Sequence, residues 1–133
     1  MIKKKFINIA KSVISLEIKA LQNLRKNINN SFNDAVIEIS KCQSKVILCG
    51  VGKSGLIASK IAATLSSVGT PSFNLSASEA SHGDLGMISK KDILILISNS
   101  GETSELKNII RFAKRNRITS VSYTHLRAHE TVM

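Results

Sequence analysis

Aromatic residues are scarce in this 133-residue sequence, at 4% of the chain, and acidic residues are outnumbered by basic ones. Proteins that bind single-stranded nucleic acid commonly use basic grooves interleaved with stacking aromatic side chains. No such interleaved run occurs here. The net charge of +10 therefore indicates solvated helix surfaces that attract small anions, and we predict no nucleic-acid partner.

Long apolar runs are also missing. The longest, "DILILIS" at 92–98, is far shorter than the roughly 20 residues that cross a bilayer. Lys11, Glu17 and Lys19 interrupt the N-terminal segment, which therefore lacks the apolar core of a signal peptide. We expect a cytoplasmic protein without a membrane partner.

Cysteine and histidine are too sparse to indicate a metal site. Cys42 and Cys49 match neither a metal-binding nor a redox spacing, and we interpret both as small buried hydrophobic residues. His125 and His129 are four residues apart and could share a helix face, but the sequence offers them no third ligand. We predict no metal and no cofactor from these residues.

The apolar pattern that is present predicts an α/β chain. Apolar residues at steps of three and four predict a long N-terminal helix through Ile28, followed by a second short helix. Apolar runs at 45–50, 72–75 and 92–98 predict strands, helices are expected at 54–67 and after "NSGETS" at 99–104, and 118–122 begins a fourth strand. This order implies a parallel sheet with right-handed crossovers.

The strand at 45–50 lacks polar alternation, so helices should cover both faces of the sheet. The predicted fold is therefore a three-layer α/β/α Rossmann-like sheet. Two sets of apolar residues are expected to face it. They are Ile57, Ile61, Ala62 and Leu65 in the helix at 54–67, and Leu106, Ile109, Ile110 and Ala113 in the helix after "NSGETS".

Three polar loops follow strands, at 50–55, 76–86 and 98–104. Ligands of such sheets bind beyond the carboxyl ends of the strands, so the three loops should line one pocket. The first loop, "GVGKSG", has the spacing of a dinucleotide fingerprint, but no acidic residue occurs between Gly55 and Glu79 to hold a ribose. It also resembles an NTPase phosphate loop, but Ile47 stands where that loop needs glycine.

A smaller anion, such as a phosphate monoester, fits these loops better. Glycines let backbone N–H groups approach an anion at the start of a helix. The stretch "SNSGET" at 98–103 adds hydroxyl groups and an amide at a second helix start. The predicted phosphate-binding residues are Gly52, Ser54, Gly55, Ser98, Asn99, Ser100, Gly101 and Thr103.

Three stretches resemble the sugar isomerase (SIS) domain and, within it, the arabinose-5-phosphate isomerases. They are "GVGKSGLIASKIAATLSSVGTPSF", "EASHGDLGMI" and "SNSGETSEL", and the resemblance runs from about residue 10 to 118. It implies an aldose–ketose isomerase that interconverts D-arabinose 5-phosphate and D-ribulose 5-phosphate for Kdo, and so for lipopolysaccharide or capsule biosynthesis. It also implies a homotetramer.

The same resemblance implies roles for particular residues. Aldose–ketose exchange needs a base and stabilisation of a developing oxyanion. Lys53 is implied to stabilise the enediolate or the substrate hydroxyls, His82 to donate or accept a proton, and Glu105 to shuttle one. Asp84 is predicted to lie in the substrate site, where it would either orient His82 or cap a turn. In some family members the position of His82 binds a metal.

After about Ile118 the chain departs from the family, with "TSVSYTHLRAHETVM" in place of the family's continuation and no CBS domains. We divide the chain into an N-terminal helical segment at 1–44, a partial SIS domain at 45–122, and an unrelated or disordered tail at 123–133. We expect this chain alone to isomerise poorly or not at all. The alternative is a non-catalytic SIS regulatory domain, which would need the hydroxyl loops but not Lys53 or the His82 loop.

Overall fold

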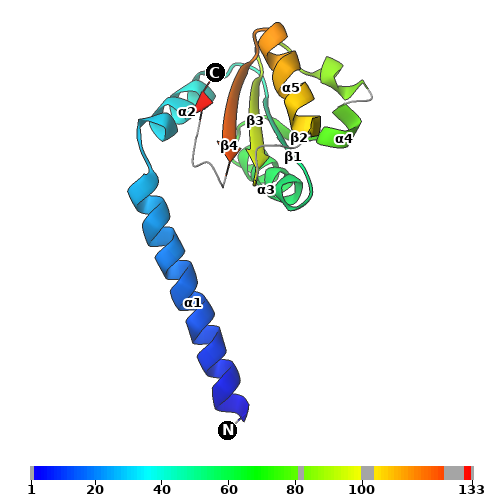
Figure 1. The fold of residues 1–133 in the computed structure, drawn as a ribbon. Helices are drawn as coiled ribbons and strands as arrows, with labels where there is room; N and C mark the ends of the chain where they lie inside the picture. The colour runs from blue at the N-terminus through cyan, green and yellow to red at the C-terminus, as the bar shows by residue number, and fades with distance from the viewer. Residues whose placement is uncertain (1, 81–82, 100–103, 125–130, 133) are drawn as a thin grey trace. The chain divides into compact units, whose positions relative to one another are not determined.

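The computed structural model describes residues 2–80, 83–99, 104–124 and 131–132, and they form two compact units that divide after Asn30 (Figure 1). The first unit is the predicted long helix, α1 (Ile2–Asn27). It buries none of its residues. Its apolar stripe is exposed along its whole length, as Ile14 (55% exposed) and Leu21 (65% exposed) illustrate.

The second unit is the predicted α/β domain. Its elements are α2 (Asn30–Lys41), β1 (Val46–Gly50), α3 (Lys53–Ser67), β2 (Ser72–Ser76), α4 (Ala77–Ala80), the 3-10 helix η1 (Asp84–Met87), β3 (Ile93–Ser98), α5 (Ser104–Arg115), β4 (Thr119–Thr124) and β5 (Thr131–Val132). The strands lie in the order β2-β1-β3-β4-β5. The first four are parallel, and β5 runs antiparallel to β4. The polar segment at 76–86, for which the sequence predicts a loop, holds the short helix α4 and most of η1 instead.

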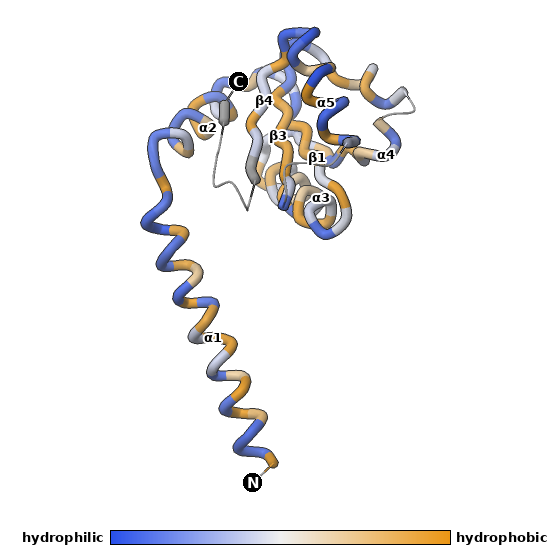
Figure 2. The backbone as a smooth tube through the Cα atoms, in the orientation of Figure 1, coloured by the Kyte–Doolittle hydropathy of each residue, from blue (hydrophilic) through white to orange (hydrophobic). Residues whose placement is uncertain are grey.

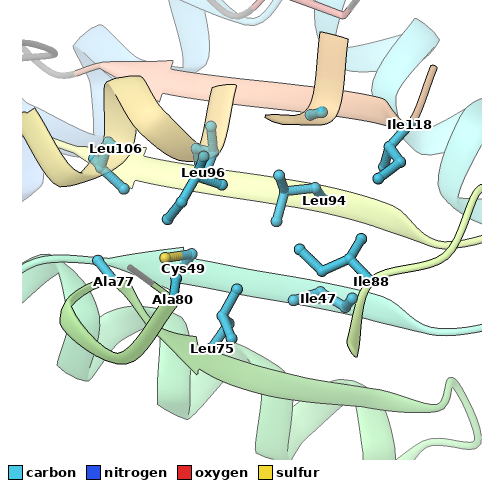
Figure 3. Packing of buried hydrophobic residues seen from close by; sticks show 12 residues of the cluster. Ile47, Cys49, Leu75, Ala77, Ala80, Ile88, Leu94, Leu96, Leu106 and Ile118 are labelled. Atoms are coloured by element: carbon cyan, nitrogen blue, oxygen red, sulfur yellow. The ribbon is translucent and has the colours of Figure 1, made fainter. Parts of the chain in front are cut away.

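Helices cover both faces of the sheet, which confirms the three-layer fold. On one face, Ile47 and Cys49 of β1 and Leu94 and Leu96 of β3 pack against α4 and α5 (Figure 3). On the other face, Val46 and Leu48 of β1 pack against α3 and the end of α2. All five residues of β1 are buried, and Figure 2 shows β1 and β3 as hydrophobic segments at the centre of this unit.

The helix α5 contacts the sheet as the sequence predicts. Its side chains Leu106, Ile109 and Ala113 are buried, and Ile110 packs partly against the same cluster. Burying a leucine or isoleucine side chain stabilises a fold by about 2 kcal/mol. The main contribution of α5 is therefore the apolar side chains that it buries in the hydrophobic core.

The predicted inward face of α3 is confirmed for Ala62 and Leu65, which pack in the core, and is wrong for Ile57 and Ile61. Ala58 and Ala62 are the buried residues, whereas Ile57 is 53% and Ile61 is 37% exposed. The two alanines are four residues apart and so share one side of the helix. Because alanine is small, α3 lies close to β1, and the larger isoleucines point away from the contact with the sheet.

A buried carboxylate joins the segments that lead into β1 and β3, at the amino-terminal ends of these strands, which we call the amino edge of the sheet. Asp92, 1% exposed, accepts hydrogen bonds from the Ser44 hydroxyl (2.5 Å), the Lys45 amide (3.1 Å) and the Ser89 amide (2.8 Å). The Lys45 ammonium lies 3.3 Å from the same carboxylate. Burial raises the pKa of Asp92, but these hydrogen bonds outweigh it and lower the pKa to about 2.

The two cysteines lie in different surroundings. Cys49 lies in β1, and burial raises the pKa of its thiol to about 11. Cys42 is half-buried, and its thiol donates to the backbone carbonyls of Lys45 (3.6 Å) and Lys91 (3.7 Å). The interpretation as a buried residue is confirmed for Cys49 and holds only in part for Cys42. Among the described residues, no helix is both long and apolar enough to cross a membrane.

Candidate functional site

The turn between β1 and α3 depends on two glycines that let the strand touch the helix. A Cβ on Gly50 would lie 2.6 Å from the Ser54 carbonyl carbon and 2.8 Å from the Gly55 nitrogen. A Cβ on Gly55 would lie 2.9 Å from the Gly50 oxygen. Neither position has room for a side chain, so the first turn of α3 is held directly against the end of β1.

Gly52 allows the backbone conformation that turns the chain from β1 into α3. Its φ of 62° lies in the left-handed region that favours glycine. It caps α3 without a side-chain hydrogen bond, and its carbonyl accepts from the Gly55 and Leu56 amides at 3.1 and 3.3 Å. The first amides of a helix have no partner four residues back in the chain. In α3 the Gly55 and Leu56 amides donate to Gly52 instead, and the positive end of the helix dipole lies at Lys53 and Ser54.

A cavity of about 340 Å³ lies at this edge of the sheet. It is lined by Lys53, Ser54, Ile57, Ile97, Ser98 and Asn99. Ile97 pairs in register with Gly50, which brings the ends of β1 and β3 side by side. Two of the three predicted loops therefore converge, as expected of the carboxyl edge of a parallel sheet.

The polar residues of the cavity differ in exposure. Lys53 is exposed at the first position of α3, and in the part of the chain that the structure describes no carboxylate lies within ion-pair distance of it. Ser98, the last residue of β3, is 7% exposed, and Asn99 beyond it is exposed. A cation, hydroxyls and an amide thus surround one cavity, a set suited to an oxygen-rich anion.

Two other predicted residues are described but do not line this cavity. Asp84 is half-buried at the start of η1. Glu105 is half-buried in the first turn of α5, where its carboxylate accepts a long hydrogen bond of 3.4 Å from the Ser104 hydroxyl. An acid in the first turn of a helix is stabilised by the helix dipole whether or not it takes part in chemistry.

Several predicted residues lie outside the described residues. They are His82, Ser100, Gly101 and Thr103, together with His125 and His129 of the tail. Among the residues that are described, no group of three His, Cys, Asp or Glu side chains could hold a metal ion.

Sequence reasoning misses two residues that line the cavity, Ile57 and Ile97. The apolar pattern places Ile57 on the sheet-facing side of α3, and Ile97 in the buried run of β3. The signal that could have placed Ile57 is its spacing of four residues from Lys53, because side chains four apart on a helix are neighbours.

The fold and this cavity define a class, namely a parallel α/β domain with a cavity at the carboxyl ends of its strands that is lined by a lysine, hydroxyl groups and an amide. The SIS domain family matches residues 38–130, more than half of the chain, and the chain belongs to this family.

The relatives that the chain resembles are longer proteins. It is 49% identical over 116 residues to an uncharacterised protein of Rickettsia prowazekii, covering 87% of this chain and 36% of that protein. It is 47% identical over 113 residues to the arabinose 5-phosphate isomerase KdsD of Yersinia pestis, covering 85% of this chain and 34% of that protein. The chain thus spans about a third of the length of these curated relatives.

A solved structure is similar as well. A protein of E. coli CFT073 in complex with arabinose 5-phosphate superimposes with a TM-score of 0.84 at 42% identity, covering 91% of this chain and 64% of that one. This similarity supports the parallel sheet and the SIS fold predicted from the sequence.

Proposed function

We propose that this chain is the N-terminal part of an aldose–ketose isomerase that interconverts D-arabinose 5-phosphate and D-ribulose 5-phosphate. The observation that carries the proposal is the cavity at the end of β1, where Lys53 lies with the hydroxyl-bearing residues Ser54 and Ser98. Within the described part of the chain, Lys53 has no carboxylate partner that would compete with a bound anion. The identity of 47% to an arabinose 5-phosphate isomerase supports the choice of reaction and substrate.

The chemistry assigned to these residues follows from what isomerisation requires. The proton on C2 of the aldose is removed, an enediolate forms, and a proton is delivered to C1. A fixed ammonium beside the reacting carbons stabilises the negative oxygen of the enediolate. In the proposal Lys53 fills that role, and His82 and Glu105 exchange the protons.

The phosphate is assigned to the backbone and hydroxyl donors of the two helix starts. Gly52, Ser54 and Gly55 belong to the first, and Ser98 and Asn99 lead into the second. Helix N-termini bind phosphate through free amides and the helix dipole. Ser100, Gly101 and Thr103 remain predicted contributors, and Asp84 a predicted neighbour of the substrate.

Two proteins test the proposal: the 133-residue chain, and a parent protein in which residues 1–118 continue into a complete SIS domain. Each is incubated with arabinose 5-phosphate, and ribulose 5-phosphate is measured in a coupled assay. We expect turnover by the parent protein and little or none by the chain alone, because the chain spans only about a third of the length of its relatives. Full activity of the chain alone would contradict the second expectation.

The regulatory alternative predicts a different pair of results. A sensor would bind a phosphosugar, detected as heat in calorimetry, without any turnover by the parent protein. Replacing Lys53 would then affect binding alone, whereas in an isomerase it would mainly lower kcat.

The proposal extends to the oligomeric state of the parent protein and to the cellular compartment in which it acts. We propose that the parent protein is a cytoplasmic homotetramer whose product feeds lipopolysaccharide or capsule biosynthesis. The exposed apolar stripe of α1 supports an assembly role, since Ile14, Ile18 and Leu21 are each more than half exposed. Light scattering of the parent protein with and without Leu21→Glu measures the assembly. An unchanged mass would argue against this role for α1.

The division of the chain also remains a proposal. We propose a helical segment at 1–44, a partial SIS domain at 45–122 and an unrelated or disordered tail at 123–133. Deleting 125–133, which keeps all of β4, should leave the urea unfolding midpoint of the chain nearly unchanged if the tail is unrelated to the domain.

A further inference from the structure

The cavity beside Lys53 has an apolar side, formed by residues that play no part in the proposed phosphate binding. Of the described residues that line it, two are isoleucines, Ile57 and Ile97. An open-chain sugar phosphate presents C–H groups as well as oxygens along its carbon chain. Binding sites for small molecules commonly combine apolar walls with a few placed polar groups.

The two isoleucines differ in what else they do. Ile97 is 9% exposed and packs with Val46, Leu48, Ala58 and Ala62 in the core between α3 and the sheet. Ile57 is 53% exposed and belongs to neither core cluster. The fold therefore depends on Ile97, whereas the apolar surface of Ile57 remains available to a ligand.

Ile57 and Lys53 line the same cavity, so a phosphosugar bound beside Lys53 would also lie close to Ile57. The two residues are four apart, so their side chains lie one above the other on the helix surface. Leu56, the neighbour of Ile57, is even more exposed at 72% but does not line the cavity. Exposure alone therefore does not single out Ile57 as a residue that contacts the ligand, since Leu56 is also exposed. Its position in the lining of the cavity does.

We propose that Ile57 is a specificity-determining residue, which contacts the carbon chain of the bound phosphosugar and sets the chain length that the cavity accepts. The inference rests on the proposed function, since it takes a phosphosugar as the ligand. Ile97 forms the fixed part of the same apolar wall. With the phosphate held at the helix starts, the carbon chain shares the cavity with Ile57, so a longer chain would have less room beside this side chain.

Calorimetric titration of the parent protein with arabinose 5-phosphate and with glucose 6-phosphate tests this inference. Ile57→Ala should weaken binding of arabinose 5-phosphate about tenfold, because a lost apolar contact in a pocket is worth roughly that factor. Binding of glucose 6-phosphate should weaken less or improve, so the ratio of the two affinities should shift at least about fivefold. Ile57→Phe should shift the ratio the other way by narrowing the cavity.

The matched control is Leu56→Ala, which removes an exposed apolar side chain one residue away. It should leave both affinities within about twofold of the wild type, since surface changes outside a site have small effects. Circular dichroism confirms that each variant is folded, and the two Ile57 variants give independent readings. An affinity ratio that neither Ile57 variant changes would overturn the inference.

The outcome separates this inference from the proposed function. Absence of turnover with an Ile57-dependent affinity ratio would overturn the isomerase and leave the specificity residue in place. Turnover with an affinity ratio that the Ile57 variants leave unchanged would support the isomerase and overturn the role of Ile57 in specificity. No binding of either sugar phosphate by the parent protein would overturn both.

Discussion

The two ends of β1 carry a lysine each, and the structure treats the two charges differently. Lys45 precedes the strand, and its ammonium lies 3.3 Å from the buried carboxylate of Asp92. Lys53 follows the strand and stands at a cavity without a carboxylate partner in the described part of the chain. A positive charge without a carboxylate partner attracts small anions more strongly than one that is already paired. We therefore interpret the Lys45 end of β1 as contributing to stability, and the Lys53 end as the place where the proposed ligand would bind.

The largest effect should come from forcing apart the contact between β1 and α3 beside the cavity. Gly50→Ala places a Cβ 2.6 Å from the Ser54 carbonyl carbon, so strand and helix must separate. We expect a loss of about 3 kcal/mol in the free energy of unfolding, measured by urea titration of the chain. Binding of arabinose 5-phosphate by the parent protein should also disappear.

Gly86→Ala is the control for this change. A Cβ at Gly86 meets nothing within 4 Å, so an effect below about 0.5 kcal/mol is expected. Equal effects at Gly50 and Gly86 would show that the contact between β1 and α3 does not matter.

The next effect concerns the lysine at the cavity. Lys53→Met keeps the length of the side chain and removes its charge. The kcat of the parent protein should fall about 100-fold or more, as happens when one stabilising donor is removed from a developing oxyanion. The urea midpoint should not change, because Lys53 is exposed and pairs with no described carboxylate.

Lys60→Met provides the comparison on the same helix. Lys60 is exposed on α3 but does not line the cavity, so its removal should leave kcat within about twofold. If the two variants behave alike, the net charge of the helix rather than the position of Lys53 would be responsible.

The amino edge should respond to acid. The pKa of Asp92 falls from 3.8 to about 2 on folding, so the unfolded chain binds its proton at a higher pH than the folded chain does. This contribution of about 2 kcal/mol is present above pH 4 and is lost as the pH falls toward 2. Asp92→Asn should therefore lessen the acid sensitivity of the urea midpoint, whereas Asp34→Asn, at an exposed site, should not.

The smallest effect should come from the paired lysine. The Lys45 side chain is 42% exposed, and Asp92 keeps its three hydrogen bonds when the ammonium is removed. Lys45→Met should lower the free energy of unfolding by about 0.5 kcal/mol, and 1 M NaCl should reduce the difference. A loss above about 2 kcal/mol would mean that the pair is far stronger than partly exposed pairs are.

Much of the fold could be predicted because its signals are local. The apolar run at 45–50 and the glycines after it predict a buried strand and a turn into a helix, and β1 and α3 confirm both. The stripe through Leu106, Ile109 and Ala113 gives the inward face of α5 correctly. Each of these signals depends only on residues close together in the sequence.

What could not be predicted depends on distances between elements. The apolar pattern places Ile57 toward the sheet because it is large and apolar, but the close contact at Gly50 and Gly55 favours the small residues Ala58 and Ala62 there. The convergence of Lys53 and Ser98 on one cavity could be predicted, because it follows from the strand order. The catalytic roles of Lys53 and Glu105 remain predictions.

The contact between Gly50 and Gly55 also bears on how freely this sequence can vary. Every replacement at either position adds at least a Cβ, and that atom would lie within 2.9 Å of backbone across the contact. Backbone cannot rotate away as a flexible side chain can. A library carrying all single substitutions, selected for function in cells, should therefore retain almost no variants at these two positions, while the nearby Leu56 accepts many.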